Sequence, residues 1–204
     1  MLAILRNLAW ITVLLLSVAT TNLSALNAAD KARPQYKHGD ILIPPANAAE
    51  PKRKTISVSS AVDYLEKGAL AWSKSRKCVT CHTNGTYMVI RPALTKQLGP
   101  PSKAIRQFFV AQLKKMEKTD LKILKSGIRP TQVAYVAAGL AEWDAHLSQK
   151  TSAETKAALT LMLKLQSKDG SWGNVDCWPP HESSSYHGAT VAAMALATAP
   201  GYLQ

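Results

Sequence analysis

The chain has 204 residues, 47% of them apolar, which is enough to build one domain around a real hydrophobic core. Its formal net charge of +12 favours acidic partners or an anionic membrane surface. No basic stretch is interleaved with the stacking aromatic side chains that single-strand nucleic-acid binders need, so nucleic acid is excluded as an expected partner.

Residues 1–29 have the pattern of a secretory signal peptide. Arg6 precedes an uncharged apolar run over 8–19, and small residues close the segment. The run is too short to cross a hydrocarbon core of about 30 Å as a helix. We therefore expect a mature start near Asp30 and a periplasmic or otherwise exported bacterial protein. An uncleaved amphiphilic anchor is the alternative.

Residues 30–58 form a basic segment with several prolines and no sustained hydrophobic period. This composition predicts a linker, either a tether or an extended surface strap. Ordered structure is expected to begin at Ser59 or Ser60, because either hydroxyl can cap the first amides of a helix. The folded domain is then expected over 59–204.

After this linker the hydrophobic period is that of helices, and strand signals are few. In the first helix Val62, Leu65, Ala69 and Trp72 are expected on one apolar face, and Pro92 is expected either to kink the second helix or to be a proline of its first turn. We predict an all-α domain of about six helices in three α/α hairpins. The expected helices cover about 59–77, 87–98, 102–118, 131–149, 152–165 and 186–199.

Three cysteines are present, an odd number that cannot all pair within one chain. Two of them stand in Cys78-Val79-Thr80-Cys81-His82, the pattern of c-type haem attachment. Two thiols at this spacing reach the two vinyl groups of one haem, and the next histidine then lies under the iron. The motif predicts haem c on Cys78 and Cys81 with His82 as the proximal ligand. A Cys78–Cys81 disulfide is the main alternative; zinc is less favoured, because adjacent Cys81 and His82 aim badly at one tetrahedral ion.

Two long polar turns share a local signature, which suggests an internal repeat. Asn84 and Asp169 each precede a glycine, and an aromatic residue follows the glycine two positions later. Such a pair permits the left-handed backbone that leaves a helix, and the aromatic side chain is expected to pack back over the turn.

The second of these turns, KLQSKDGSWG at 164–173, resembles the Gln-Trp repeat of squalene-hopene and oxidosqualene cyclases. The block WSKSRKCVTCHTNGTYMVIRPAL at 72–94 is similar to the first repeat of exported bacterial squalene-cyclase-like proteins that carry a haem-attachment motif. The resemblance covers about 59–201. It implies a partial α/α toroid, roughly half a ring, which is either a fragment or a subunit that an oligomeric partner completes.

The resemblance also implies two functions for which the residues of this chain differ from the family pattern. Cyclases of this family use an acidic cluster as the proton donor, and the chain has no Asp-x-Asp-Asp run, so we do not expect it to cyclise a triterpene alone. Related prenyltransferase β subunits bind zinc through Asp, Cys and His. Asp176, Cys177 and His181 are faintly similar, but the first two are consecutive and diverge, so a rigid loop with a buried Cys177 is favoured.

A second axial ligand for the iron would have to come from the opposite haem face. His187 is favoured, because it follows the second turn on a segment that can reach the first; an open five-coordinate iron is the alternative. The candidates are Met116, Met162, His146, His181 and His187.

The sequence therefore predicts an exported haem c protein for electron transfer to a redox partner, or for haem-based ligand binding, with no catalytic residue assigned. Its basic surface would guide an acidic partner or peripheral membrane association. The alternative is a terpenoid-cyclase-like enzyme or a module that binds an isoprenoid-like lipid, with CxxCH in a structural role.

Overall fold

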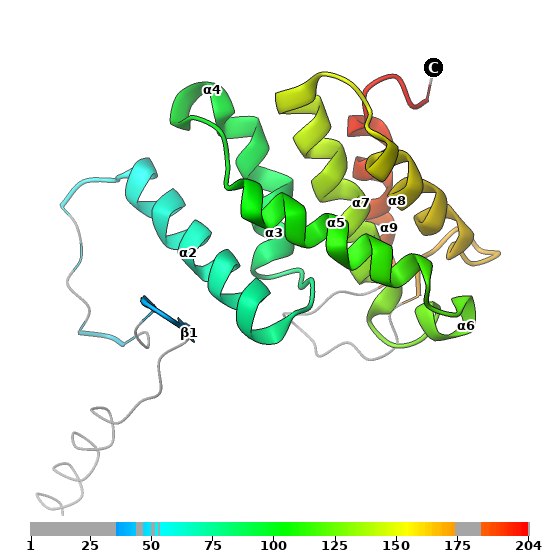
Figure 1. Cartoon of the computed structure of the whole chain (residues 1–204), viewed down its shortest axis with the longest axis horizontal. Coiled ribbons are helices and arrows are strands. Elements are labelled where there is room, and N and C mark those ends of the chain that lie inside the picture. Colours follow the sequence, from blue (N-terminus) through cyan, green and yellow to red (C-terminus); the bar gives the residue numbers. More distant parts are fainter. Residues whose placement is uncertain (1–35, 44–46, 50–51, 53, 174–184, 204) are drawn as a thin grey trace, which may run out of the picture.

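The computed structural model, which describes residues 36–43, 47–49, 52, 54–173 and 185–203, is built of helices apart from one short hairpin (Figure 1). The all-α class is therefore confirmed. The strands are β1 (Tyr36–His38) and β2 (Ile41–Ile43). The helices are α2 (Val58–Arg76), α3 (Asn84–Ile90), a 3-10 turn (Arg91–Leu94), α4 (Thr95–Leu98), α5 (Lys103–Glu117), α6 (Leu121–Leu124), α7 (Arg129–Trp143), a π-helical turn (Asp144–Ser148), α8 (Ala153–Lys164) and α9 (Ser185–Thr198).

The β1–β2 hairpin lies within the segment interpreted as a linker. Its strands pair antiparallel, with Tyr36 opposite Ile43, and Gly39 occupies the turn with a positive φ of 58°. Both strands contact α2. Strands of three residues are too short for a period of two to stand out from the sequence, which is why the hairpin was not predicted.

The first long helix begins slightly earlier than its predicted cap. Ser57, not Ser59 or Ser60, is the N-cap, and its hydroxyl accepts a hydrogen bond from the amide of Ser60 at 3.3 Å. The predicted apolar face is correct at buried Ala69 and wrong at Leu65, whose side chain is exposed. Val62 and Leu65 line an open apolar hollow between α2 and α3, and the buried residues of α2 all lie from Gly68 onward.

The second predicted helix is divided instead of kinked. The chain forms α3, then a 3-10 turn, then α4, and Pro92 lies in the first turn of the 3-10 segment. Helix α4 is terminated by Gly99, which has a φ of 72°. Proline lacks the amide hydrogen that an α-helix interior needs, so the tighter turn accommodates it at its start.

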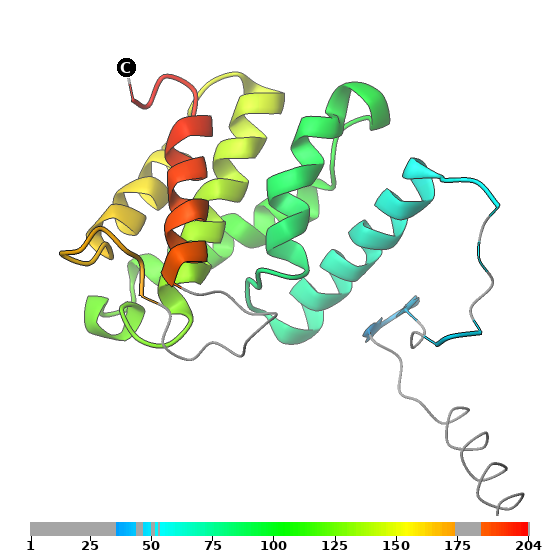
Figure 2. The ribbon, with the colours of Figure 1, turned by 180° about the vertical axis from the view of Figure 1, so that it is seen from behind.

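Helix α7 is the centre of the core, and α3, α5, α8 and α9 all pack against it. Gly139 lets α3 approach α7 closely, because a Cβ at this position would lie 2.8 Å from Cβ of Met88 on α3. Helix α9 lies beside α7 in both views (Figures 1 and 2) and packs on it far more than on α8. The predicted third hairpin, 152–165 with 186–199, is thus a looser pair than the sequence suggests.

The end of α7 is joined to the start of α8 through a buried carboxyl group. Asp144 opens the π-helical turn and accepts hydrogen bonds from the amide of Ser152 and the hydroxyl of Thr155, both at 2.6 Å. Ser152 caps α8 as predicted, with its hydroxyl accepting from the amide of Thr155.

Within the part of the chain that the structure describes, no helix combines the length and the apolar character needed to cross a bilayer.

Helices α2 and α3 are tied together by a tyrosine. The hydroxyl of Tyr87 donates to the carboxyl group of Glu66, and the amide of Ser102 donates to Tyr87 at 3.4 Å. Burial, and then the hydrogen bond to Glu66, raise the pKa of Tyr87 well above its usual value of 10.0. The phenol therefore stays protonated in the folded chain at pH values that ionise it in the unfolded chain.

We expect the stabilising effect of Tyr87 to be present below pH 10 and to be lost as the pH rises further, because only the unfolded state then releases the proton. At neutral pH Tyr87→Phe should lower the free energy of unfolding by about 1 kcal/mol through loss of the hydrogen bond. The difference in free energy of unfolding between wild type and variant, measured by urea unfolding, should become smaller above pH 10. Tyr64→Phe, at an exposed site on α2, is the control; a gap that stays constant with pH would contradict the assignment.

Candidate haem-attachment site

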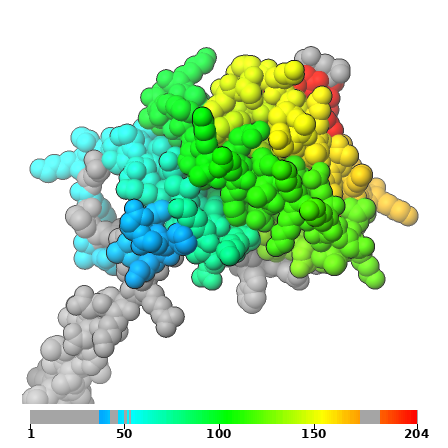
Figure 3. Space-filling model, in the orientation of Figure 1, coloured from blue at the N-terminus to red at the C-terminus, as the bar shows by residue number. Residues whose placement is uncertain are grey.

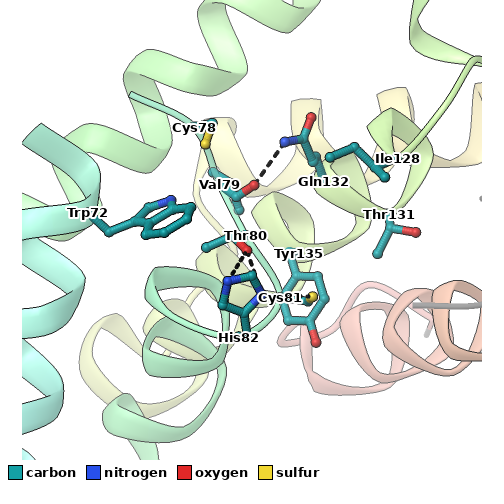
Figure 4. Close-up of a pocket in the computed structure, with 10 residues that line it drawn as sticks. All are labelled: Trp72, Cys78, Val79, Thr80, Cys81, His82, Ile128, Thr131, Gln132 and Tyr135. Atoms are coloured by element: carbon teal, nitrogen blue, oxygen red, sulfur yellow. Dashed lines mark hydrogen bonds between the residues drawn. The ribbon is translucent and has the colours of Figure 1, made fainter. Parts of the chain in front are cut away.

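The CxxCH motif occupies the turn between α2 and α3, beside a cavity of about 180 Å³ (Figure 4). Helix α2 ends at Lys77, whose φ of 55° turns the chain sharply into the motif. Cys78 and Cys81 both line the cavity, both are half-buried and both are free thiols. Trp72 of α2 lines one side of this space, and Gln132 and Tyr135 of α7 line the other.

A buried asparagine holds the turn in shape. Asn84 is the first residue of α3, and its side-chain oxygen accepts from the amide of Thr80 at 2.9 Å. Its side-chain nitrogen donates to the carbonyl of Cys78 and to the hydroxyl of Ser73, each at 3.0 Å. Ser73 in turn donates to the carbonyl of Ala69 within α2. One amide group therefore fixes the motif to the end of α2.

Two further contacts hold the turn against α3 and α7. The amide of Gly85 donates to the carbonyl of Thr80 at 2.9 Å, and the side chain of Gln132 donates to the carbonyl of Val79 at 2.9 Å. A Cβ at Gly85 would lie 2.5 Å from the Thr80 oxygen and 2.8 Å from a ring carbon of Tyr135. Glycine is required here by close approach and not by backbone conformation.

The two polar turns therefore differ, contrary to the interpretation of a shared left-handed pair. Gly170 has φ of 86°, and Trp172 packs back over its turn with the indole nitrogen donating to the carbonyl of Met162 at 2.8 Å. Asn84 and its glycine instead begin a right-handed helix. The left-handed residue of the first turn is Lys77, seven positions earlier.

The imidazole of His82 stands at the border of two hollows. It lines the cavity that the two thiols share, and it also lines a smaller apolar hollow of about 60 Å³ between α2 and α3. Its ring is exposed and meets Trp72 edge-on at 5.5 Å, while Nδ1 lies 3.1 Å from the hydroxyl of Thr80. The His82 ring therefore has an aromatic neighbour and a hydrogen-bond partner that orient it.

The residues of this turn fit a covalently held haem. Two free thiols and one imidazole line one cavity, and these are the groups that two thioether bonds and one iron ligand need. The walls add apolar surface from Trp72, Val79 and Ile128, which suits a porphyrin. The disulfide alternative is not formed in this structure. The Asp176, Cys177 and His181 group falls outside the described residues.

The candidates for a second iron ligand are spread through the molecule. Met116 and Met162 are core residues, as their helical spacing suggested, and His146 lies 3.2 Å from the carboxyl group of Glu142. His181 falls outside the described residues. Among the candidates that the structure describes, His187 approaches the cavity through Tyr135, and Met116 lines a neighbouring hollow together with Cys78. The role of His187 as a ligand stays a prediction.

His187 reaches the cavity through Tyr135. Its Nε2 lies 2.9 Å from the Tyr135 hydroxyl, and the two rings are 5.8 Å apart. Tyr135 itself lines the cavity, so it separates the imidazole from the thiols. Burial first, and then the nearby Cys81, raise the pKa of Tyr135 to about 12. The phenol is therefore neutral at physiological pH.

The sequence predicted roles for the three motif residues and His187, and these stay predictions, but it did not point to the residues that position them. Asn84 was read as a turn former, and Tyr135 and Gln132 had no signal beyond their place on an amphipathic helix. Comparison with models of protein families, with curated proteins and with solved structures gives no significant match to this chain. The site is therefore interpreted from its own geometry.

We expect Asn84→Ala to lower the free energy of unfolding of the reduced protein by about 3 kcal/mol, because it removes three hydrogen bonds in a buried place. Gln97→Ala, at an exposed site on α4, should change it by less than about 0.5 kcal/mol. Urea unfolding of both variants measures the difference. Equal effects would show that the Asn84 amide does not hold the turn.

Proposed function

We propose that this protein is an exported c-type haem protein that transfers single electrons. The observation that carries the proposal is that Cys78, Cys81 and His82 line one cavity, on a turn that a buried side chain holds. In this reading Cys78 and Cys81 are the thioether anchors, and His82 is the proximal ligand of the iron. When bound, the haem would supply a one-electron iron couple.

The surrounding side chains have separate tasks in this proposal. Trp72 meets the ring of His82 at its edge and limits how the imidazole rotates, while Thr80 offers its hydroxyl to Nδ1. Tyr135 and Val79 present carbon atoms to the cavity and keep water from its inner wall. Tyr135 lies between His187 and the cavity. His187 could bind iron only if its imidazole gave up the hydrogen bond to the Tyr135 hydroxyl.

The charge of the chain supports the choice of electron transfer over an enzymatic role. Cleavage of the predicted signal peptide would remove one positive charge, Arg6, from the +12 of the full chain. The positive charge that remains would raise the rate of encounter with an acidic redox partner, an effect that falls with ionic strength. The alternative from the sequence, an isoprenoid-binding module on a partial α/α toroid, places a lipid in the same cavity and needs no haem.

Coexpression with a cytochrome c maturation system should yield a red, exported protein whose mass exceeds that of the mature polypeptide by one haem. The colour should survive extraction with acidified acetone, because thioether bonds hold the porphyrin. Replacement of Cys78 and Cys81 together by alanine should abolish both signals. Cys177→Ala, at the third cysteine, should retain them and serves as the matched control.

The same preparation separates the competing readings. Protein of unmodified mass whose Cys78 and Cys81 are joined as a disulfide would refute haem attachment. Colourless protein that binds a polyprenyl lipid saturably would favour the isoprenoid-binding module instead.

A further inference from the structure

An exposed apolar corner surrounds the short helix α6. We call residues 118–129 the α6 tip. Three large aliphatic side chains of the tip face solvent: Leu121, Ile123 and Ile128 are 43%, 49% and 42% exposed. Helix α6 lies at the lower right edge of the molecule in Figure 1, and the same corner projects in the space-filling view of Figure 3. Burial of these side chains would remove apolar surface from water, which is energetically favourable.

Cations surround the same corner. The tip carries Lys118, Lys122, Lys125 and Arg129, all of them exposed, against one acidic residue, Asp120. Within the described part of the chain none of the four forms a salt bridge. The Asp120 carboxyl group is used locally, since it caps α6 by accepting from the amide of Lys122 at 2.7 Å. The tip therefore has an uncompensated positive charge.

Contacts with the core and within the turn hold the tip in place. Leu124 is buried and anchors α6 in the core, while Leu121 and Ile123 on the same short helix remain exposed. Gly127 turns the chain with φ of 59°, and Arg129 donates to the hydroxyl of Ser126 at 2.9 Å. The aliphatic side chains are thus presented by an ordered corner.

We propose that the α6 tip docks the protein on the surface of an anionic lipid bilayer. Leu121, Ile123 and Ile128 enter the boundary between headgroups and acyl chains, and the surrounding lysines and Arg129 contact lipid phosphates. A bilayer surface satisfies both features of the tip at once. An acidic protein surface would match the cations but would leave three aliphatic side chains against polar groups.

This docking has a consequence for the cavity. Ile128 belongs both to the tip and to the lining of the CxxCH cavity, together with Thr131, Gln132 and Tyr135 of α7. A protein bound through the tip therefore holds one wall of that cavity next to the lipid headgroups. The proposal itself depends only on the tip and stands whether or not haem is attached.

Cosedimentation with vesicles tests the proposal, using phosphatidylcholine alone and an equal mixture of phosphatidylcholine and phosphatidylglycerol. The apolar pair Leu121→Gln with Ile123→Gln, and the charge pair Lys122→Glu with Lys125→Glu, should each lower partitioning onto the mixed vesicles by at least about tenfold. Binding of the wild type should weaken with added salt, and that of the charge pair should change little. All variants keep the same N-terminus, so any binding through it is common to them.

Matched pairs on other helices provide the controls. Leu163→Gln with Met194→Gln changes two similarly exposed apolar side chains on α8 and α9, and Lys156→Glu with Lys164→Glu reverses two exposed charges on α8. These pairs should bind the mixed vesicles nearly as the wild type does, and all four should show wild-type urea midpoints. The proposal is overturned if wild type ignores the mixed vesicles, if control pairs lose as much binding, or if poly-glutamate is bound while vesicles are not.

Discussion

The side-chain amide of Asn84 is the interaction on which the candidate site depends. It is fully buried, it accepts from Thr80 and it donates to Cys78 and Ser73, so one group of atoms bonds the backbone at two points within the motif and also the side chain of Ser73. A turn that carries two thiols and an imidazole has few apolar atoms of its own to stabilise it. Asparagine supplies the stability instead, because its amide is both donor and acceptor.

The contacts across the turn come from α2, α3 and α7. Gln132 and Tyr135 stand one turn apart on α7, and one reaches the backbone of Val79 while the other closes the cavity. The almost complete burial of α7 is therefore what gives the exposed turn a rigid support. The core and the candidate site share this helix, so substitutions on α7 affect both.

The sequence predicted the helices better than the contacts between them. Helices α5, α8 and α9 were found within a few residues, because their apolar side chains recur with a helical period and Ser152 caps α8. Leu65 was misplaced on a buried face, since the period cannot show how closely a neighbouring helix packs. The CxxCH motif is visible in the sequence because it is local, and its role stays a prediction. The bond of Asn84 to Ser73 and that of Tyr135 to His187 were not predicted, because these partners lie 11 and 52 residues away.

The convergence of contacts on one turn also bears on biosynthesis. The backbone from Cys78 to Thr80 is bonded to side chains of α3 and α7, and these helices come together only when the chain folds. Both sulfur atoms are half-enclosed once that has happened. A bulky group is therefore most easily joined to both sulfurs while the polypeptide is still unfolded.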